Sequence, residues 1–226
     1  MNIIPIEFSI VVVGEDCNPT ILNPDFLKYR GIVPAAWGWE LGGPPITTPA
    51  LSIVQYATGI MIKVEPKRFQ ITDVAGADDV AQSKALEIAR RYIEVLPHVR
   101  YTAVGNNIRA FVEMLSPQEF LKGSFIRSGS WDTEEHPLHE VSLSFRYAHD
   151  DSRLTLSLES GAFLRQEDGL QHQAEGLLLS GHYHRECGDY PMDAQVLSHI
   201  AKAAADMAHF QALVSKILHS AAQAGS

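Results

Sequence analysis

The second half of the chain alternates apolar and polar residues with a period of two, and this pattern constrains the fold more than any other feature of the sequence. A period of two sends alternate side chains to opposite faces of a β-strand, so that one face is buried and the other meets solvent. The pattern covers 140–147 and 153–159, on either side of a turn at 149–151, and returns in 174–187. Its apolar positions are Val141, Leu143, Phe145, Tyr147, Leu154, Leu156, Leu158, Leu177, Leu179 and Tyr183. These segments predict a hairpin and a third strand, each with one polar face.

The chain ends with a segment whose apolar residues are spaced by three and four. This stripe runs through 196–217 and predicts a helix over 192–220. An apolar stripe on a helix needs a partner surface, and the apolar face of the second-half strands supplies one. We therefore expect the final helix to lie over Leu143, Leu156 and Leu179.

The first half predicts a similar succession of strands followed by a helix. An apolar strand lies near the N-terminus, at 6–13, and a long connection rich in turn-forming residues follows it. Three short strands come next at hairpin spacing, at Leu51–Ala57, Ile60–Glu65 and Arg68–Asp73, and they predict a meander. Apolar residues at helical spacing then predict a helix that Pro97 ends.

A further strand is predicted between the two halves, at 100–114. The run Gly105, Asn106 and Asn107 is typical of a β-bulge that bends a strand, and a backbone site for a ligand is the alternative reading. A short helix that starts at Ser116 and a polar loop at 123–137 then lead into the second half.

These elements together favour an antiparallel α+β fold. Strands that follow one another directly, with helices set apart, are typical of this class and not of a doubly wound parallel sheet. We expect a predominantly antiparallel sheet of about eight strands with two longer helices packed on one face. With 226 residues, the chain suits a single domain, 1–226. A duplicated β-meander-plus-helix unit, with pseudo-halves at 1–122 and 139–226, stays open because no residue-level repeat supports it.

Charge and composition exclude several classes of protein. The net charge is −9, and no segment gathers the Lys and Arg residues that bind phosphate backbones, so we expect no nucleic-acid partner. No apolar run reaches the length of about 18 residues that a membrane span requires. The two cysteines, Cys17 and Cys187, are too few for a disulfide framework, and the N-terminus lacks the pattern of a secretory signal. We therefore expect a cytoplasmic protein.

The sharpest local candidate for a chemical site is the segment that contains His182, His184 and Glu186. Their spacing by two puts both imidazoles and the carboxylate on one side of a strand, where they could act as ligands of a divalent metal such as zinc or iron. His136 and His139 could add ligands, although their spacing is no more specific. The competing interpretation is an ordinary solvated sheet face, and it is favoured because this spacing is common in strands. We therefore expect no cofactor, with a divalent metal ion as the alternative.

Two further groups of residues could contact a partner. Trp37 and Trp39 lie on the long early connection, where paired indoles either form a binding platform or close one end of the core. Met207, Phe210 and Val214 belong to the apolar stripe of the final helix, which either packs inside the chain or mediates association.

The sequence contains no phosphate-binding glycine loop, zinc-protease motif, paired-cysteine motif or nucleophile elbow. Our leading hypothesis is therefore a non-enzymatic component of an intracellular complex that binds a protein partner or a second copy of itself. One alternative is a metal-dependent hydrolase or oxygenase that uses His182, His184 and Glu186. A second alternative is a small-ligand-binding protein with its pocket between helix and sheet.

Overall fold

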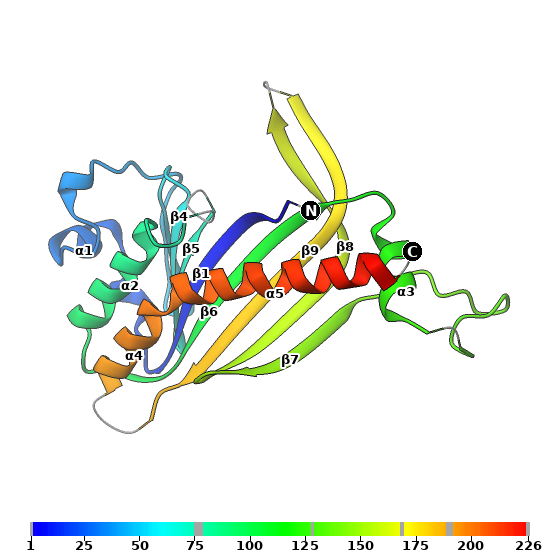
Figure 1. Cartoon of the computed structure of the whole chain (residues 1–226). Coiled ribbons are helices and arrows are strands. Elements are labelled where there is room, and N and C mark those ends of the chain that lie inside the picture. The colour runs from blue at the N-terminus through cyan, green and yellow to red at the C-terminus, as the bar shows by residue number, and fades with distance from the viewer. Residues whose placement is uncertain (1, 75–78, 128, 168–169, 189–191, 225–226) are drawn as a thin grey trace.

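The chain forms one nine-stranded sheet within the residues that the structure, a computed structural model, describes: 2–74, 79–127, 129–167, 170–188 and 192–224 (Figure 1). Every strand pairs antiparallel with its neighbours, in the order β2-β3-β4-β5-β1-β6-β9-β8-β7. The antiparallel α+β fold is thereby confirmed. The strands are β1 Ile4–Glu15, β2 Ile46–Thr47, β3 Ser52–Gln55, β4 Ile60–Glu65, β5 Arg68–Asp73, β6 Arg100–Glu113, β7 Leu143–His149, β8 Ser152–Glu167 and β9 Leu170–Glu186.

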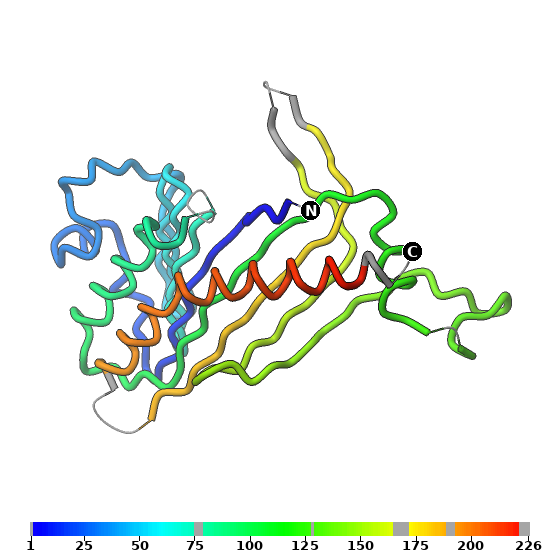
Figure 2. Tube along the Cα trace, viewed as in Figure 1, coloured from blue at the N-terminus to red at the C-terminus, as the bar shows by residue number. Residues whose placement is uncertain are grey.

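Helices cover one face of this sheet. Ser83 caps the N-terminus of the second helix, where its side chain accepts a hydrogen bond from the backbone N–H of Ala85 at 3.1 Å. The last helix crosses β6, β9 and β8 (Figure 2). The helices are α1 Pro24–Tyr29, α2 Lys84–Val95, α3 Pro117–Phe125, α4 Met192–Ala201 and α5 Ala203–Ala224, with short 3-10 turns at Pro19–Ile21 and Ala35–Trp37. None of the described helices is long and apolar enough to cross a membrane.

The packing of α5 on the second-half strands confirms the main sequence prediction. Leu156 and Leu179 are buried beneath it, and Leu143 packs against the same core. Phe210 of α5 lies against Gly181, where a Cβ atom would come within 2.6 Å of its ring. Each large apolar side chain that is fully buried in this way stabilises the fold by about 1.5–3 kcal/mol.

The final helix differs from the prediction, because α4 and α5 replace one continuous helix. The interruption lies at Lys202, whose backbone N–H donates to the His199 carbonyl at 3.3 Å in a tightened turn. The break lets α4 contact β6 and α2, while α5 contacts β6 and continues across the sheet to α3 (Figure 2). Asp206, at the start of α5, then reaches Arg185 of β9. Periodicity alone does not reveal this break, since the apolar spacing continues through it.

The predicted bulge at Gly105, Asn106 and Asn107 is wrong. The register between β6 and β9 runs through these residues without a shift, and the irregularities of β6 lie elsewhere along its pairing with β1. The glycine has a different role, because a Cβ atom on Gly105 would lie 2.9 Å from the ring of His182. Gly105 therefore makes room for an imidazole from the neighbouring strand.

The two predicted pseudo-halves meet inside the single sheet. A meander, β3-β4-β5, precedes α2, and a second meander, β7-β8-β9, precedes α4 and α5. The strands β1 and β6 lie side by side between the two meanders and join them into one sheet. An ancestral duplication of the two halves stays a prediction.

Candidate functional site

The face of the sheet opposite α5 carries a continuous row of polar side chains. Strand register aligns one residue from each of six neighbouring strands, and the aligned residues alternate with the buried apolar positions of the same strands. We call this set the polar row. From β7 to β5, it consists of Arg146, Thr155, His182, Asn107, Ser9 and Thr72. The last two, Ser9 and Thr72, are buried, so only the first four reach the surface.

A second row runs beside the polar row, two residues further along each strand. Here Arg153 of β8 lies opposite His184 of β9, and His184 lies opposite Gly105 of β6. Arg153 is also a diagonal neighbour of Arg146, because Arg146 faces Thr155 across the hairpin. Two arginines and two histidines therefore gather on three adjacent strands.

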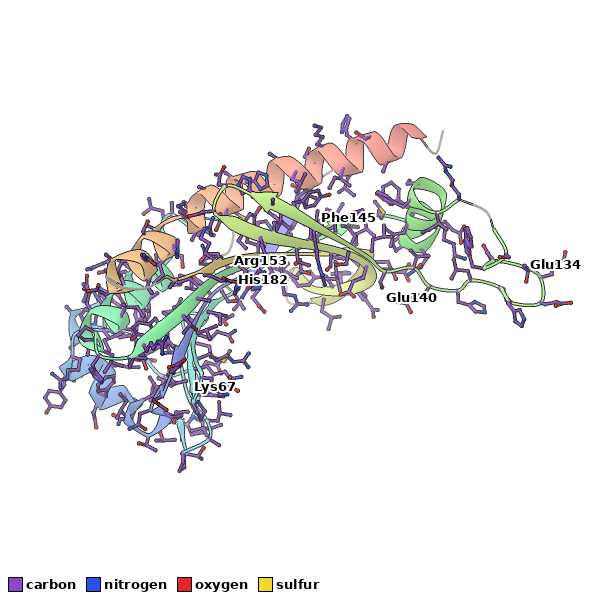
Figure 3. The ribbon with its side chains drawn as sticks, turned by 90° about the horizontal axis from the view of Figure 1, so that it is seen from below. Lys67, Glu134, Glu140, Phe145, Arg153 and His182 are labelled. Atoms are coloured by element: carbon purple, nitrogen blue, oxygen red, sulfur yellow. The ribbon has the colours of Figure 1, made fainter. Side chains whose placement is uncertain are left out.

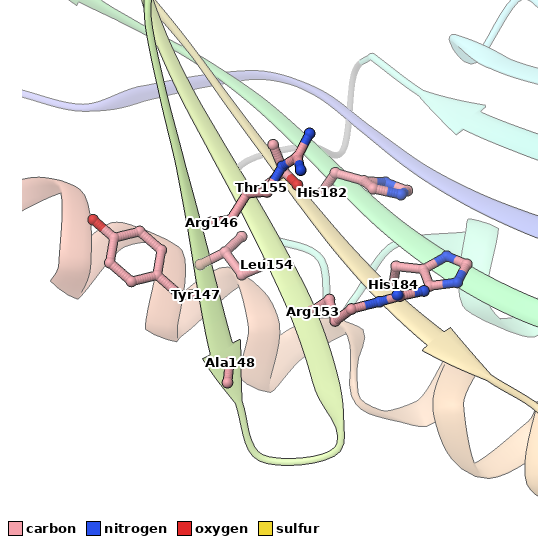
Figure 4. A pocket seen from close by; sticks show the side chains of 8 residues that line it. All are labelled: Arg146, Tyr147, Ala148, Arg153, Leu154, Thr155, His182 and His184. Atoms are coloured by element: carbon pink, nitrogen blue, oxygen red, sulfur yellow. The ribbon is translucent and has the colours of Figure 1, made fainter.

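These residues line an open groove with a volume of about 540 Å³ (Figure 4). Arg146 and Arg153 extend across the strands toward His182 and His184 (Figure 4). Arg153 and His182 lie on the side of the sheet away from α5 (Figure 3). The lining residues are Arg146, Tyr147, Ala148, Arg153, Leu154, Thr155, His182 and His184.

His182 is oriented by hydrogen bonds that cross three strands. Its Nδ1 contacts the side-chain Oδ1 of Asn107, and Asn107 Nδ2 donates to Ser9 Oγ at 3.3 Å. Because Asn107 Oδ1 is an acceptor, the neutral imidazole carries its hydrogen on Nδ1 and leaves Nε2 as an acceptor. Desolvation is the main cause that lowers the pKa of His182, and the electrostatic interaction with the neighbouring His184 lowers it further.

The groove is locally cationic although the whole chain is acidic. Arg153 Nη2 lies 2.6 Å from Glu186 Oε1, and both side chains are 71% exposed, so this ion pair is weak. Glu186 is also 4.0 Å from His184 Nε2. Arg146 forms no ion pair with any residue that the structure describes. Glu186 thus pairs with one of the two guanidinium groups of the groove and lies near one of its two imidazoles.

The predicted metal residues share a face, as their spacing indicates, and His182 and His184 line the groove. Their ring centroids are 5.9 Å apart. Glu186 is paired with Arg153, while His136 and His139 lie on the loop that precedes β7. Within the described part of the chain, no three His, Cys, Asp or Glu side chains are grouped closely enough to hold a metal ion.

The predicted partner-binding tryptophans are partly buried and pack against the core. The ring centroids of Trp37 and Trp39 are 4.7 Å apart, and Trp39 meets Tyr56 edge-on at 5.4 Å. The Lys84 ammonium lies 5.0 Å from the centroid of Trp37, and the Arg91 guanidinium 5.6 Å from it. The two tryptophans thus attach the early connection to α2, and they lie far from the groove along the sheet.

Met207, Phe210 and Val214 do not form an accessible surface. Their exposed fractions are 5%, 0% and 1%, because the apolar stripe of α5 packs on the chain's own sheet. The structure therefore supports the interpretation in which this stripe packs inside the chain. Contact between these residues and a partner would require α5 to leave the core.

Sequence reasoning missed a buried charged cluster between α5 and the sheet. Arg185 donates to both carboxylate oxygens of Asp206 at 2.7 Å, and both side chains are 2% exposed. Asn106 Nδ2 also donates to Asp206, at 2.8 Å, and Arg185 Nε donates to Asp151 at 2.9 Å. One signal could have indicated this pair: Arg185 falls on the apolar face of its strand, and Asp206 lies next to Met207 in the helix stripe.

The interior beneath α5 is therefore filled by apolar side chains and this charged cluster, and the groove described above lies on the other face. No protein-family model matches the sequence, and no curated protein is significantly similar to it. The groove and the polar row are thus the features from which a function can be inferred.

Proposed function

We propose that this protein is a non-enzymatic binding component that holds an acidic segment of a protein partner on the helix-free face of its sheet. The observation that carries the proposal is the pair of exposed arginines, Arg146 and Arg153, that line a groove beside His182 and His184 in a chain with a net charge of −9. Complementary charge selects a partner and accelerates its association, whereas the acidic remainder of the surface repels the same partner. Binding is therefore directed to this face.

The dimensions of the polar row suit an extended segment. The part of the row that is at least partly exposed crosses β7, β8, β9 and β6, so a spacing of about 4.8 Å between neighbouring strands makes it about 14 Å long. An extended chain of about four residues has this length. The hydroxyl of Thr155 and the amide of Asn107 lie along the exposed part of the row, where they can exchange hydrogen bonds with a peptide backbone.

A peptide of eight glutamates with a fluorescent label tests the proposal. We expect its fluorescence anisotropy to rise with protein concentration at low salt, and the affinity to fall as salt is added. The double variant Arg146→Ala with Arg153→Ala should weaken binding about tenfold or more, because a hydrogen bond to a charged group contributes about 1.5–3 kcal/mol. A peptide of eight glutamines controls for contacts that do not depend on charge.

The matched control variant removes two positive charges from the helix-covered side of the sheet. Arg90 of α2 and Lys216 of α5 are both exposed, so Arg90→Ala with Lys216→Ala changes the net charge equally without touching the groove. We expect this variant to bind the glutamate peptide like the parent. Equal weakening by the two double variants, or no binding by the parent, would contradict the proposal.

A further inference from the structure

The corner of the groove around Thr155 offers more hydrogen-bond donors than one carboxylate can accept. Arg146 lies directly opposite Thr155 on β7, and Arg153 precedes Thr155 by two residues on the same face of β8. Each guanidinium presents a planar fork of N–H donors, and the threonine hydroxyl adds another. Three donor-bearing side chains therefore arise from neighbouring positions of one hairpin.

The Arg146 side chain ends beside Thr155 and His182, and the Arg153 side chain ends beside His184 (Figure 4). Both guanidinium groups extend from the outer hairpin toward His182 and His184 (Figure 4). Diagonal neighbours of an antiparallel pair are about 7–8 Å apart at the backbone, a separation that two long arginine side chains can bridge through a shared anion.

We propose that this corner binds a phosphorylated side chain of the partner, with the phosphate monoester dianion held between Arg146 and Arg153 and by the hydroxyl of Thr155. This proposal rests on the proposed function, since the phosphoryl group belongs to the segment that the helix-free face holds. A phosphate dianion has three acceptor oxygens and matches two guanidinium charges. A carboxylate carries one charge and two oxygens, so it occupies only one fork.

The carboxylate of Glu186 already binds one of these two guanidinium groups. Its carboxylate lies 2.6 Å from Arg153 and competes for the position that the ligand would take. Because Glu186 and Arg153 are both largely exposed, the pair is weak and a dianion can displace it. Glu186→Gln should therefore strengthen binding of the phosphorylated ligand, because it removes the competing charge and its repulsion.

Three acidic peptides that differ at one central residue provide the test. The residue is phosphoserine, phosphotyrosine or glutamate, and binding to the full chain is followed by fluorescence anisotropy. We expect one of the phosphorylated peptides to bind about tenfold or more tightly than the glutamate peptide, as one additional charge-assisted hydrogen bond would give. Arg146→Lys keeps the charge but loses the fork, so it should abolish this preference while the glutamate peptide still binds. Lys216→Ala should leave the preference intact.

The outcomes separate the two proposals. If none of the peptides binds, the proposed function fails. If all three bind with equal affinity, the acidic-segment function holds and the phosphoryl site is refuted. A competition experiment with inorganic phosphate completes the test. If inorganic phosphate displaces the glutamate peptide at the same concentration as the phosphopeptide does, the corner is a site for small anions, and the assignment to a phosphorylated partner is overturned.

Discussion

Removal of the Asp206 carboxylate is the sharpest test of how α5 is held to the sheet. In Asp206→Ala, the Arg185 guanidinium loses two hydrogen bonds of 2.7 Å and the Asn106 amide loses one of 2.8 Å. Arg185 is 2% exposed, so water does not replace the lost carboxylate without local opening. A buried cation would then remain, with Asp151 as its acidic partner at 2.9 Å.

The expected cost follows from this burial. Loss of one partner of a buried ion pair typically destabilises a protein by about 3–5 kcal/mol, because the remaining charge stays desolvated. For a chain of 226 residues, this corresponds to a fall in melting temperature of about 6–20 °C. The contact from Asp151, which is 40% exposed, should keep the loss toward the lower end of the range.

Urea unfolding followed by far-ultraviolet circular dichroism measures the effect, provided that the slope m is unchanged. The control is Glu94→Ala, which breaks an exposed pair with Arg90 and should cost less than about 1 kcal/mol. A double variant, Arg185→Met with Asp206→Leu, should recover most of the lost stability, because it removes both charges together. A cost for Asp206→Ala no larger than that for Glu94→Ala would refute the reasoning that the pair is desolvated.

Three further predictions concern the same helix and its surroundings. Gly181→Ala should lower the free energy of unfolding by about 1–3 kcal/mol, because the added Cβ meets the Phe210 ring at 2.6 Å, and an unchanged urea midpoint would contradict this. Burial raises the pKa of Asp151, but hydrogen bonds from the neighbouring cations Lys202 and Arg185 outweigh burial and lower this pKa to about 2. The ionised Asp151 carboxylate therefore stabilises the fold fully above pH 3.8, and this stabilisation is lost as the pH falls toward 2. The stability difference between the parent and Asp151→Asn should narrow over that interval in urea titrations. Burial and a neighbouring imidazole lower the pKa of His209, so the parent should lose stability as the pH falls below 6.5, and His209→Gln should show a smaller loss.

The sequence predicted those parts of the fold that depend on local burial. A period of two in the later strands and a three-four spacing in the last segment both reflect which side of an element meets the core. Leu156, Leu179 and Phe210 accordingly lie in one core, as the pattern required. Local burial could not predict the break between the two last helices at Lys202, because the charged side chains near this break pair with residues that are distant in the sequence. Asp206, for example, contacts Asn106, 100 residues earlier.

The candidate site was only partly predictable, for a related reason. Alternation placed His182 and His184 on one polar face, and it did so without knowledge of any neighbouring strand. The order β6-β9-β8-β7 and its register bring Asn107 to one side of His182, and Thr155 and Arg146 to the other. Register depends on pairing over the whole sheet, and a one-residue slip would send every one of these side chains to the opposite face.

Two segments connect the groove to the buried charged cluster: strand β9, whose successive side chains point to opposite faces of the sheet, and the turn that precedes β8. His184 faces the groove, whereas its neighbour Arg185 points to the opposite side and binds both Asp206 and Asp151. Asp151 lies in the β7–β8 turn, also contacts Lys202 between α4 and α5, and precedes Arg153 by two residues. The outer wall of the groove is therefore tied to the helices behind the sheet. Because binding is strengthened when the donors are held in position before the ligand arrives, the buried charges that fix α5 also preorganise the hairpin that carries Arg153.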